Sequence, residues 1–149
     1  MKKTILLISL LSLTLSSLTF ASNKKEIYTD AAPAPIGTYS QAIAVGSTVY
    51  ISGQIPIDPK TGALVPGDFT ASMEQAIHNL NAIAIAAGGN LDNIVKVTVY
   101  MPDLSNFATV NTVMEKYFHK PYPARAAIEI KSLPKNAPVE IEAVLVLDH

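Results

Sequence analysis

The side chains with the clearest chemical potential lie near the C-terminal end of the chain: Arg125, Glu140 and Glu142. Arg125 is the only arginine, so any two-pronged grip on a carboxylate must use its guanidinium, whose paired N–H donors match that geometry. A sole arginine on the same sheet as two carboxylates is a candidate binding site. The alternative is an exposed, charged sheet face without a ligand, and the pattern by itself favours this simpler interpretation.

Two strand-like segments carry these residues, joined by a proline-containing loop over residues 133–138. Side chains alternate between the two faces of a strand. The polar set of the first segment therefore shares one face: Arg125, Ala127, Glu129 and Lys131. Glu140 and Glu142 likewise share one face of the second segment.

The segments upstream complete a single domain. Residues 22–36 are polar or proline-rich and are expected to form an irregular lead-in. Hydrophobic periodicity and turn residues predict the elements that follow. They are strands over 39–45 and 48–52, a helix over 69–87, a strand over 94–101, a helix over 104–119 and the two C-terminal strands. Asp68 or Thr70 can cap the first helix, and Gly88-Gly89 can end it.

The order of these elements, β β α β α β β, favours crossover connections that place both helices on one face of one sheet. The last strand is apolar on both faces. Val144 and Val146, in line with Glu140 and Glu142, would therefore form an exposed apolar patch unless another subunit covers it. We expect an α+β fold that assembles as a homo-oligomer, with the charged sheet face near a subunit boundary.

The N-terminus has the pattern of a secretory signal peptide. Lys2 and Lys3 precede an apolar run, and Thr19-Phe20-Ala21 supplies a small-residue cleavage site after Ala21. The run falls short of the roughly 20 apolar residues of a spanning helix. Cleavage would place one domain, residues 22–149, in the periplasm or outside the cell, with no membrane association.

Composition argues against several classes of function. Without residues 1–21, nine basic residues stand against twelve acidic ones, a net charge of −3. Nucleic-acid binding is disfavoured because it depends on neutralising phosphates. The absence of cysteine excludes disulfides, thiol nucleophiles and thiolate metal sites. The histidines, His78, His119 and His149, are scattered along the chain, so we expect neither a metal nor a cofactor.

Six short motifs, in chain order, are more specific than composition as indicators of function. They are Ile36-Gly37-Thr38-Tyr39-Ser40-Gln41, Ser52-Gly53-Gln54-Ile55-Pro56, Asp58-Pro59-Lys60-Thr61-Gly62, Phe107-Ala108-Thr109-Val110-Asn111, Tyr122-Pro123-Ala124-Arg125 and Glu140-Ile141-Glu142-Ala143. Together the motifs resemble the RidA (YjgF) family of enamine/imine deaminases, over about residues 31–147. The resemblance implies a chorismate-mutase-like mixed sheet with two helices, assembled as a homotrimer with active sites between subunits.

This resemblance also implies a reaction, the hydrolysis of short-lived 2-imino acids to 2-oxo acids and ammonia. The 2-imino acids are tautomers of enamines such as 2-aminoacrylate. Arg125 would hold the substrate carboxylate, and Glu140 would position and polarise the attacking water. Tyr39, Ser52 and Asn111 would contact substrate or water, or support the site. Backbone groups that follow Arg125, at Ala127, would line it.

Structural interpretations stand beside these roles. Tyr39 could be an ordinary strand aromatic, Ser52 could shape a loop, and Asn111 could border the apolar stripe of its helix. Glu142 is interpreted as a structural ion-pair partner.

The sequence departs from the family pattern at two positions. Ala127 stands where many relatives have cysteine, and Thr38 replaces the proline of Gly-Pro-Tyr. A non-catalytic carboxylate-binding relative and an apolar-surface chaperone remain alternatives to the deaminase. A ribonuclease fits poorly with the negative balance and the single arginine.

Overall fold

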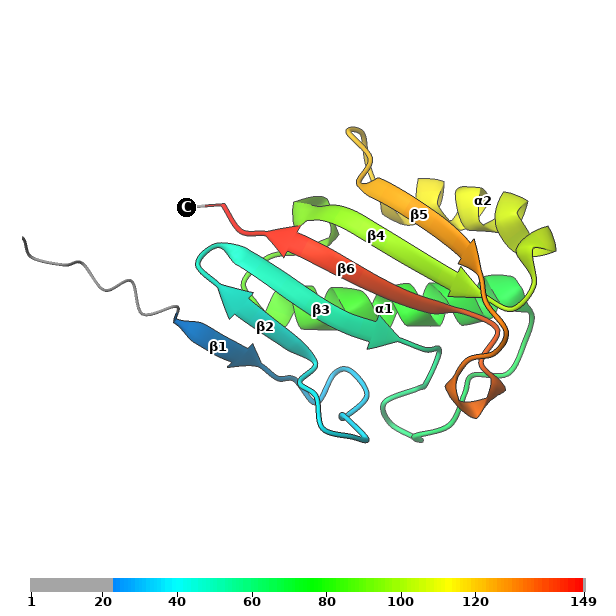
Figure 1. Cartoon of the computed structure of the whole chain (residues 1–149), viewed down its shortest axis with the longest axis horizontal. Coiled ribbons are helices and arrows are strands. Elements are labelled where there is room, and N and C mark those ends of the chain that lie inside the picture. Colours follow the sequence, from blue (N-terminus) through cyan, green and yellow to red (C-terminus); the bar gives the residue numbers. More distant parts are fainter. Residues whose placement is uncertain (1–22, 149) are drawn as a thin grey trace, which may run out of the picture.

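A computed structural model describes residues 23–148 of the chain (Figure 1). The strands are β1 (Lys24–Ile27), β2 (Ala42–Val45), β3 (Thr48–Gln54), β4 (Ile94–Met101), β5 (Ala124–Glu129) and β6 (Glu140–Val146). The helices are α1 (Phe69–Ala86) and α2 (Phe107–Tyr117), with single 3₁₀ turns at Leu91–Asn93, Leu104–Asn106 and Pro134–Asn136. The predicted signal peptide, residues 1–21, lies outside the described residues.

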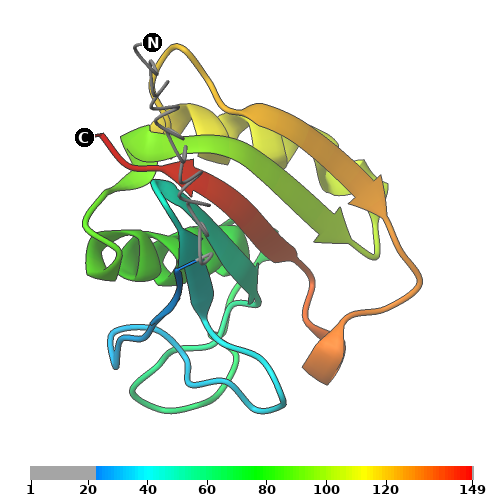
Figure 2. The same cartoon turned by 60° about the vertical axis from the view of Figure 1, so that its left-hand side comes forward.

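The strands form one mixed sheet in the order β1-β2-β3-β6-β4-β5. Only the β4–β5 pair is parallel, and every other neighbouring pair is antiparallel. The crossovers through α1 and α2 place both helices on the same face, as Figure 2 shows. This arrangement confirms the predicted α+β fold with two helices on one side. Between helices and sheet lies the core, which includes Met73, Leu80, Val99 and Leu145.

The first helix follows its sequence signals closely. Asp68 is its N-cap and accepts a hydrogen bond from the Ala71 amide at 2.9 Å, which satisfies one of the helix's unpaired N–H donors. Met73, Ile77 and Leu80 are fully buried at helical spacing. α1 therefore presents one apolar stripe to the sheet. α2 packs beside α1 in the same helical layer.

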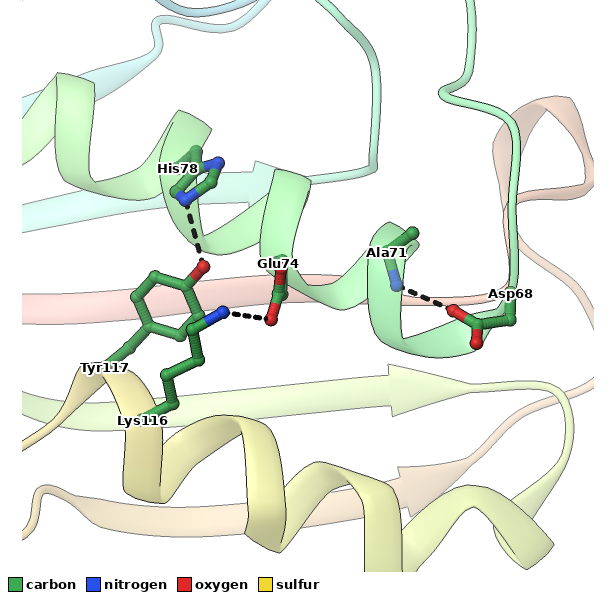
Figure 3. Close-up of polar contacts among 6 residues, drawn as sticks. All are labelled: Asp68, Ala71, Glu74, His78, Lys116 and Tyr117. Carbon is green, nitrogen blue, oxygen red and sulfur yellow. Dashed lines mark hydrogen bonds and ion pairs between the residues drawn. The ribbon is translucent and has the colours of Figure 1, made fainter.

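The end of α2 is tied to the outer face of α1 by two polar contacts, drawn in Figure 3. Lys116 Nζ donates to Glu74 Oε1 at 2.8 Å, and the Tyr117 hydroxyl lies 3.1 Å from His78 Nε2. Exposed contacts of this kind contribute little stability individually. They join the two helices to each other and involve none of the predicted site residues.

The lead-in contains a strand that the sequence did not predict. Residues 24–27 form β1, which pairs antiparallel with β2 at the edge of the sheet, so the expectation of an irregular segment over 22–36 is wrong there. The rest of the lead-in is held by Gln41, a buried side chain. Its amide donates to the carbonyls of Thr29 at 2.9 Å and Pro33 at 2.9 Å.

The sheet face opposite the helices is uncovered in the protomer. Tyr50 pairs with Val144 across β3 and β6, and Tyr50 and Val146 are 55% and 37% exposed. The predicted apolar patch on this face is confirmed. Neither helix within residues 23–148 has the length and apolar character of a membrane span.

Candidate active site

Arg125 and Glu140 lie on opposite faces of the sheet. Arg125 is beside Val97 in the β4–β5 pairing, and Val97 is beside Ala143 of β6. Directly paired residues share a face, and Val97 is buried among the core residues. Glu140 pairs instead with Tyr100 on the open face. Arg125 and the two glutamates share one sheet, as predicted, but within one protomer they do not share a face, because the face of Arg125 is set by long-range strand register.

The guanidinium of Arg125, a residue of β5, contacts three side chains of α2. Its Nη1 donates to Asn111 Oδ1 at 2.8 Å and approaches Met114 Sδ at 3.4 Å. Its guanidinium carbon lies 5.3 Å from the centroid of the Phe107 ring, a distance typical of a cation–π contact. These contacts orient the guanidinium and leave its other N–H groups for a ligand. An open cavity of about 430 Å³ lies here, lined by Asn111, Met114, Glu115, Tyr122, Pro123 and Arg125.

Asn111 therefore has a defined role that differs from direct substrate contact. It lies on α2 one turn after Phe107, so both side chains meet the same guanidinium. The interpretation that Asn111 only borders the helix stripe is wrong. In the protomer, Asn111 is the group that positions Arg125.

A second cavity, of about 440 Å³, lies at the other side of the sheet and contains Glu140. Tyr39, Ser52 and Gly53 line it with Glu140 and Glu142. Its remaining walls are largely apolar and come from the lead-in and two loops: Pro33, Ala34, Ile36, Ile55, Ile57 and Pro134. The cavity brings three of the predicted site residues together: Tyr39, Ser52 and Glu140.

Gly53 makes room for the catalytic candidate. A Cβ atom on this residue would overlap the Glu140 carboxylate. The missing side chain is therefore a requirement of the site, because the carboxylate occupies the space that any other residue would fill. In the sequence Gly53 is only one residue of the motif over 52–56, and no local pattern indicates this role.

Burial and a neighbouring charge change the pKa of Glu140 in the same direction. Partial burial raises the pKa of Glu140, and the negative charge of Glu142 raises it further. Glu142 accepts a hydrogen bond from the Tyr100 hydroxyl at 2.9 Å. The interpretation of Glu142 as an ion-pair partner is wrong, because its partner within residues 23–148 is this neutral phenol.

Tyr39 and Ser52 differ in how firmly they are held. The Ser52 hydroxyl donates to the Ser40 carbonyl at 2.7 Å, and the Ser52 amide donates to Gln41 O at 2.9 Å. Ser52 thus fixes the loop that carries Tyr39. Tyr39 lies in that loop before β2, is 49% exposed and accepts a hydrogen bond from the Ile36 amide at 3.4 Å. Tyr39 lines the cavity. The prediction that Tyr39 lies in a strand is wrong, because β2 begins at Ala42.

Ala127 lies two residues after Arg125 on β5 and is partly buried against the core. Its side chain lines neither of the two cavities. β5 is an edge strand, so a contribution from Ala127 to ligand binding would come through its backbone. Residues 23–148 contain no group of three or more metal-ligating side chains.

Comparison with known proteins identifies the chain's relatives. A family model described as "Endoribonuclease L-PSP" matches residues 29–147. A 2-iminobutanoate/2-iminopropanoate deaminase of Bos taurus is 49% identical over 83% of this chain and 90% of its own length. The crystal structure of RidA from a Psychrobacter species is 51% identical, with a TM-score of 0.80 over 83% of this chain and 99% of that one. The chain belongs to the RidA (YjgF) family.

Other RidA relatives carry different descriptions. A RutC family protein of Pyrococcus horikoshii is 50% identical over 81% of this chain and 96% of its own length. The Escherichia coli protein TdcF, solved with bound serine, is 39% identical, with a TM-score of 0.78 over 84% of this chain and all of that one. Family membership therefore fixes the fold, while the activity has to be argued from the site.

Proposed function

We propose that this protein hydrolyses enamine and 2-imino acid intermediates, such as 2-aminoacrylate and 2-iminobutyrate, to 2-oxo acids and ammonia. The observation that carries the proposal is that the protomer presents an oriented arginine on one side of the sheet and, on the other, a partly buried glutamate whose pKa is raised. The first suits a carboxylate, and the second suits proton transfer to and from water. Deaminase-named relatives at 48–49% identity support the same chemistry.

We further propose a homotrimer in which Arg125 of one protomer and Glu140 of the next complete each site. One small substrate needs both groups, whereas a single protomer separates them on opposite sheet faces. The exposed apolar residues of the open face, Tyr50 and Val146, supply a surface that association would bury. Cyclic assembly is a common solution for such a surface.

In the proposed reaction the substrate carboxylate binds Arg125, which places C2 beside Glu140. Glu140 accepts a proton from a water molecule as the water oxygen bonds to C2, and it returns that proton to the substrate nitrogen. In the second step Glu140 takes the proton of the new hydroxyl and delivers it to the amino nitrogen as the C=O bond forms and the C–N bond breaks. The nitrogen therefore leaves as ammonia, and the glutamate is regenerated.

We also propose that the mature protein, residues 22–149, is exported through the predicted signal peptide. The family match begins at residue 29, after the proposed cleavage point. An exported deaminase would meet imino acids formed outside the cytosol, for example by amino-acid oxidation. The molecular mass of the protein recovered from the producing cells would test cleavage directly.

A carboxylate-binding protein without turnover is the second candidate. A solved relative holds bound serine, which shows that the scaffold of that protein accommodates a small amino acid. On this alternative the present chain would bind such ligands through Arg125 but would not accelerate hydrolysis.

The deciding experiment generates 2-aminoacrylate or 2-iminobutyrate in situ and follows 2-oxo acid formation against a scavenger of the imine. It compares residues 22–149 with Arg125→Ala and Arg125→Lys variants. We expect acceleration by wild type, loss with alanine and weak activity with lysine, which keeps the charge but not the two-pronged geometry. Ligand binding without turnover would support the second candidate, and equal turnover by all three proteins would overturn the assignment of Arg125.

A further inference from the structure

Tyr100 directs its hydroxyl away from the nearest glutamate in the strand register. Tyr100 of β4 pairs with Glu140 of β6, so the two side chains stand side by side on the open face. The hydroxyl nevertheless donates to Glu142 at 2.9 Å. The Tyr100 hydroxyl therefore donates its hydrogen bond to Glu142 and not to Glu140, although both carboxylates are on the same face.

Other polar side chains around the cavity also donate their hydrogen bonds to groups other than Glu140. The Ser52 hydroxyl donates to the Ser40 carbonyl, and the Gln54 amide donates to the carbonyls of Ser52 and Gly53. No hydrogen bond within residues 23–148 reaches the carboxylate of Glu140. Neither of its oxygens is therefore committed to a hydrogen-bond donor in this part of the protomer.

The charged and titratable groups that face Glu140 come from three elements. β6 supplies Glu142, β4 supplies Tyr100, and the loop before β2 supplies Tyr39. The loop that contributes Pro134 also carries a cation, Lys135, but its ammonium points to the Gly62 carbonyl at 3.5 Å. Within the described part of the protomer, the charge beside Glu140 is therefore negative.

We propose that Tyr100 and Glu142 act as a positioning pair for Glu140. Tyr100 fixes Glu142 as a negative charge in the cavity and keeps its own hydroxyl from capping Glu140. Glu140 can then take up and return the proton that imine hydrolysis moves. This inference rests on the proposed deaminase function and adds two residues to it that act through Glu140.

The direction of the pKa shifts is consistent with this role. Glu142 contributes to the raised pKa of Glu140 after burial, and the hydrogen bond to Glu142 is the main cause of the raised pKa of Tyr100. A stronger base takes a proton from water more readily. The charge of Glu142 therefore makes Glu140 a stronger base.

Three variants separate the charge from the hydrogen bond. Glu142→Gln keeps an oxygen for Tyr100 but removes the charge, so the pKa of Glu140 should fall. Glu142→Ala also releases the Tyr100 hydroxyl, which can then donate to Glu140 and lower its pKa further. Tyr100→Phe keeps the charge of Glu142 without its anchor, so a smaller decrease is expected. Glu74→Gln is the matched control, because Glu74 pairs with Lys116 on the helix face.

The test combines a carboxyl-carbon NMR titration with the pH dependence of kcat/KM, using the protein in the assembly it forms in solution. Glu140→Gln assigns the resonance of Glu140. We expect Glu142→Gln to move the titration of Glu140 and the acidic limb of the rate profile to lower pH together. It should also reduce kcat/KM several-fold at neutral pH, whereas Glu74→Gln should change neither.

The two readouts distinguish failure of this inference from failure of the proposed function. An unchanged Glu140 titration in Glu142→Gln would overturn the inference even if the wild type is an active deaminase. A shifted titration with an unchanged rate profile would overturn it as well, since the pair would then have no effect on the reaction. Absence of turnover in the wild type would remove the proposed function and this role with it, while the NMR titration would still report on Glu140.

Discussion

At the scale of single residues, the site depends on an absent side chain as much as on those present. Gly53 lies where a Cβ would overlap the Glu140 carboxylate. We expect Gly53→Ala to displace Glu140 and to reduce kcat by about a hundredfold, the lower end of the contribution of a proton-transferring group. Gly37→Ala is the control, because its added Cβ would meet Tyr39 at an ordinary 3.5 Å. Equal activities of the two variants, measured in the imine assay, would argue against this role.

Glu140 should also influence stability as a function of pH. Because its folded-state pKa is raised, the folded protein binds this proton more tightly than the unfolded chain does. The corresponding stability is present in acid and is lost as the pH rises through the folded-state pKa. Glu140→Gln should therefore be more stable than wild type near neutral pH, by less than about 1 kcal/mol at this partly solvated site.

Urea denaturation near neutral pH and again below the ordinary pKa of glutamate would measure this difference. The advantage of Glu140→Gln should disappear in the acidic sample, where wild-type Glu140 is protonated in both states. A stability difference of the same size in both samples would point to a packing effect of the amide.

At the scale of elements, α2 orients the guanidinium of Arg125 for ligand binding. Asn111 accepts a hydrogen bond from Arg125 at 2.8 Å, and hydrogen bonds to charged groups typically contribute about 1.5–3 kcal/mol. We expect Asn111→Ala to raise KM about tenfold and to change kcat less, because the guanidinium would lose its fixed orientation. Thr112→Ala, at an exposed position of the same helix, should leave both constants unchanged. A loss confined to kcat would instead indicate that Asn111 contacts the reacting atoms.

The sequence predicted elements well where local signals decide. The stripe of Met73, Ile77 and Leu80 and the cap at Asp68 were sufficient for α1, because helix periodicity and capping are local properties. β1 was missed because Lys24–Ile27 is short and charged and becomes a strand only by pairing with β2. Its partner lies far along the chain, so no local pattern reports it.

The candidate site shows the same division between local and long-range information. The motifs named Arg125, Glu140, Tyr39 and Ser52, and alternation correctly separated the two faces of each strand. Alternation does not say how the faces of different strands correspond. The parallel register of β5 on β4 decides that Arg125 points toward α2, and this register depends on the whole sheet.

At the scale of the whole molecule, the open sheet face is expected to be the contact between protomers. Val146→Glu would place a charge on this exposed apolar face, where burial without a partner is costly. We expect the variant to dissociate into folded protomers and to lose activity with association. Sedimentation and circular dichroism would measure the two effects. Ile85→Glu, at a 60% exposed position on α1, should remain associated, and a fully active Val146→Glu monomer would contradict the shared site.

The placement of Arg125 and Glu140 on opposite faces has a genetic consequence. If each site draws its arginine from one chain and its glutamate from the next, two inactive alleles can complement each other. In any closed ring of three that mixes Arg125→Ala and Glu140→Gln chains, one interface joins an intact arginine to an intact glutamate. Co-expression in equal amounts should then restore about a quarter of wild-type activity with random assembly. Two defective genes would together encode a working enzyme.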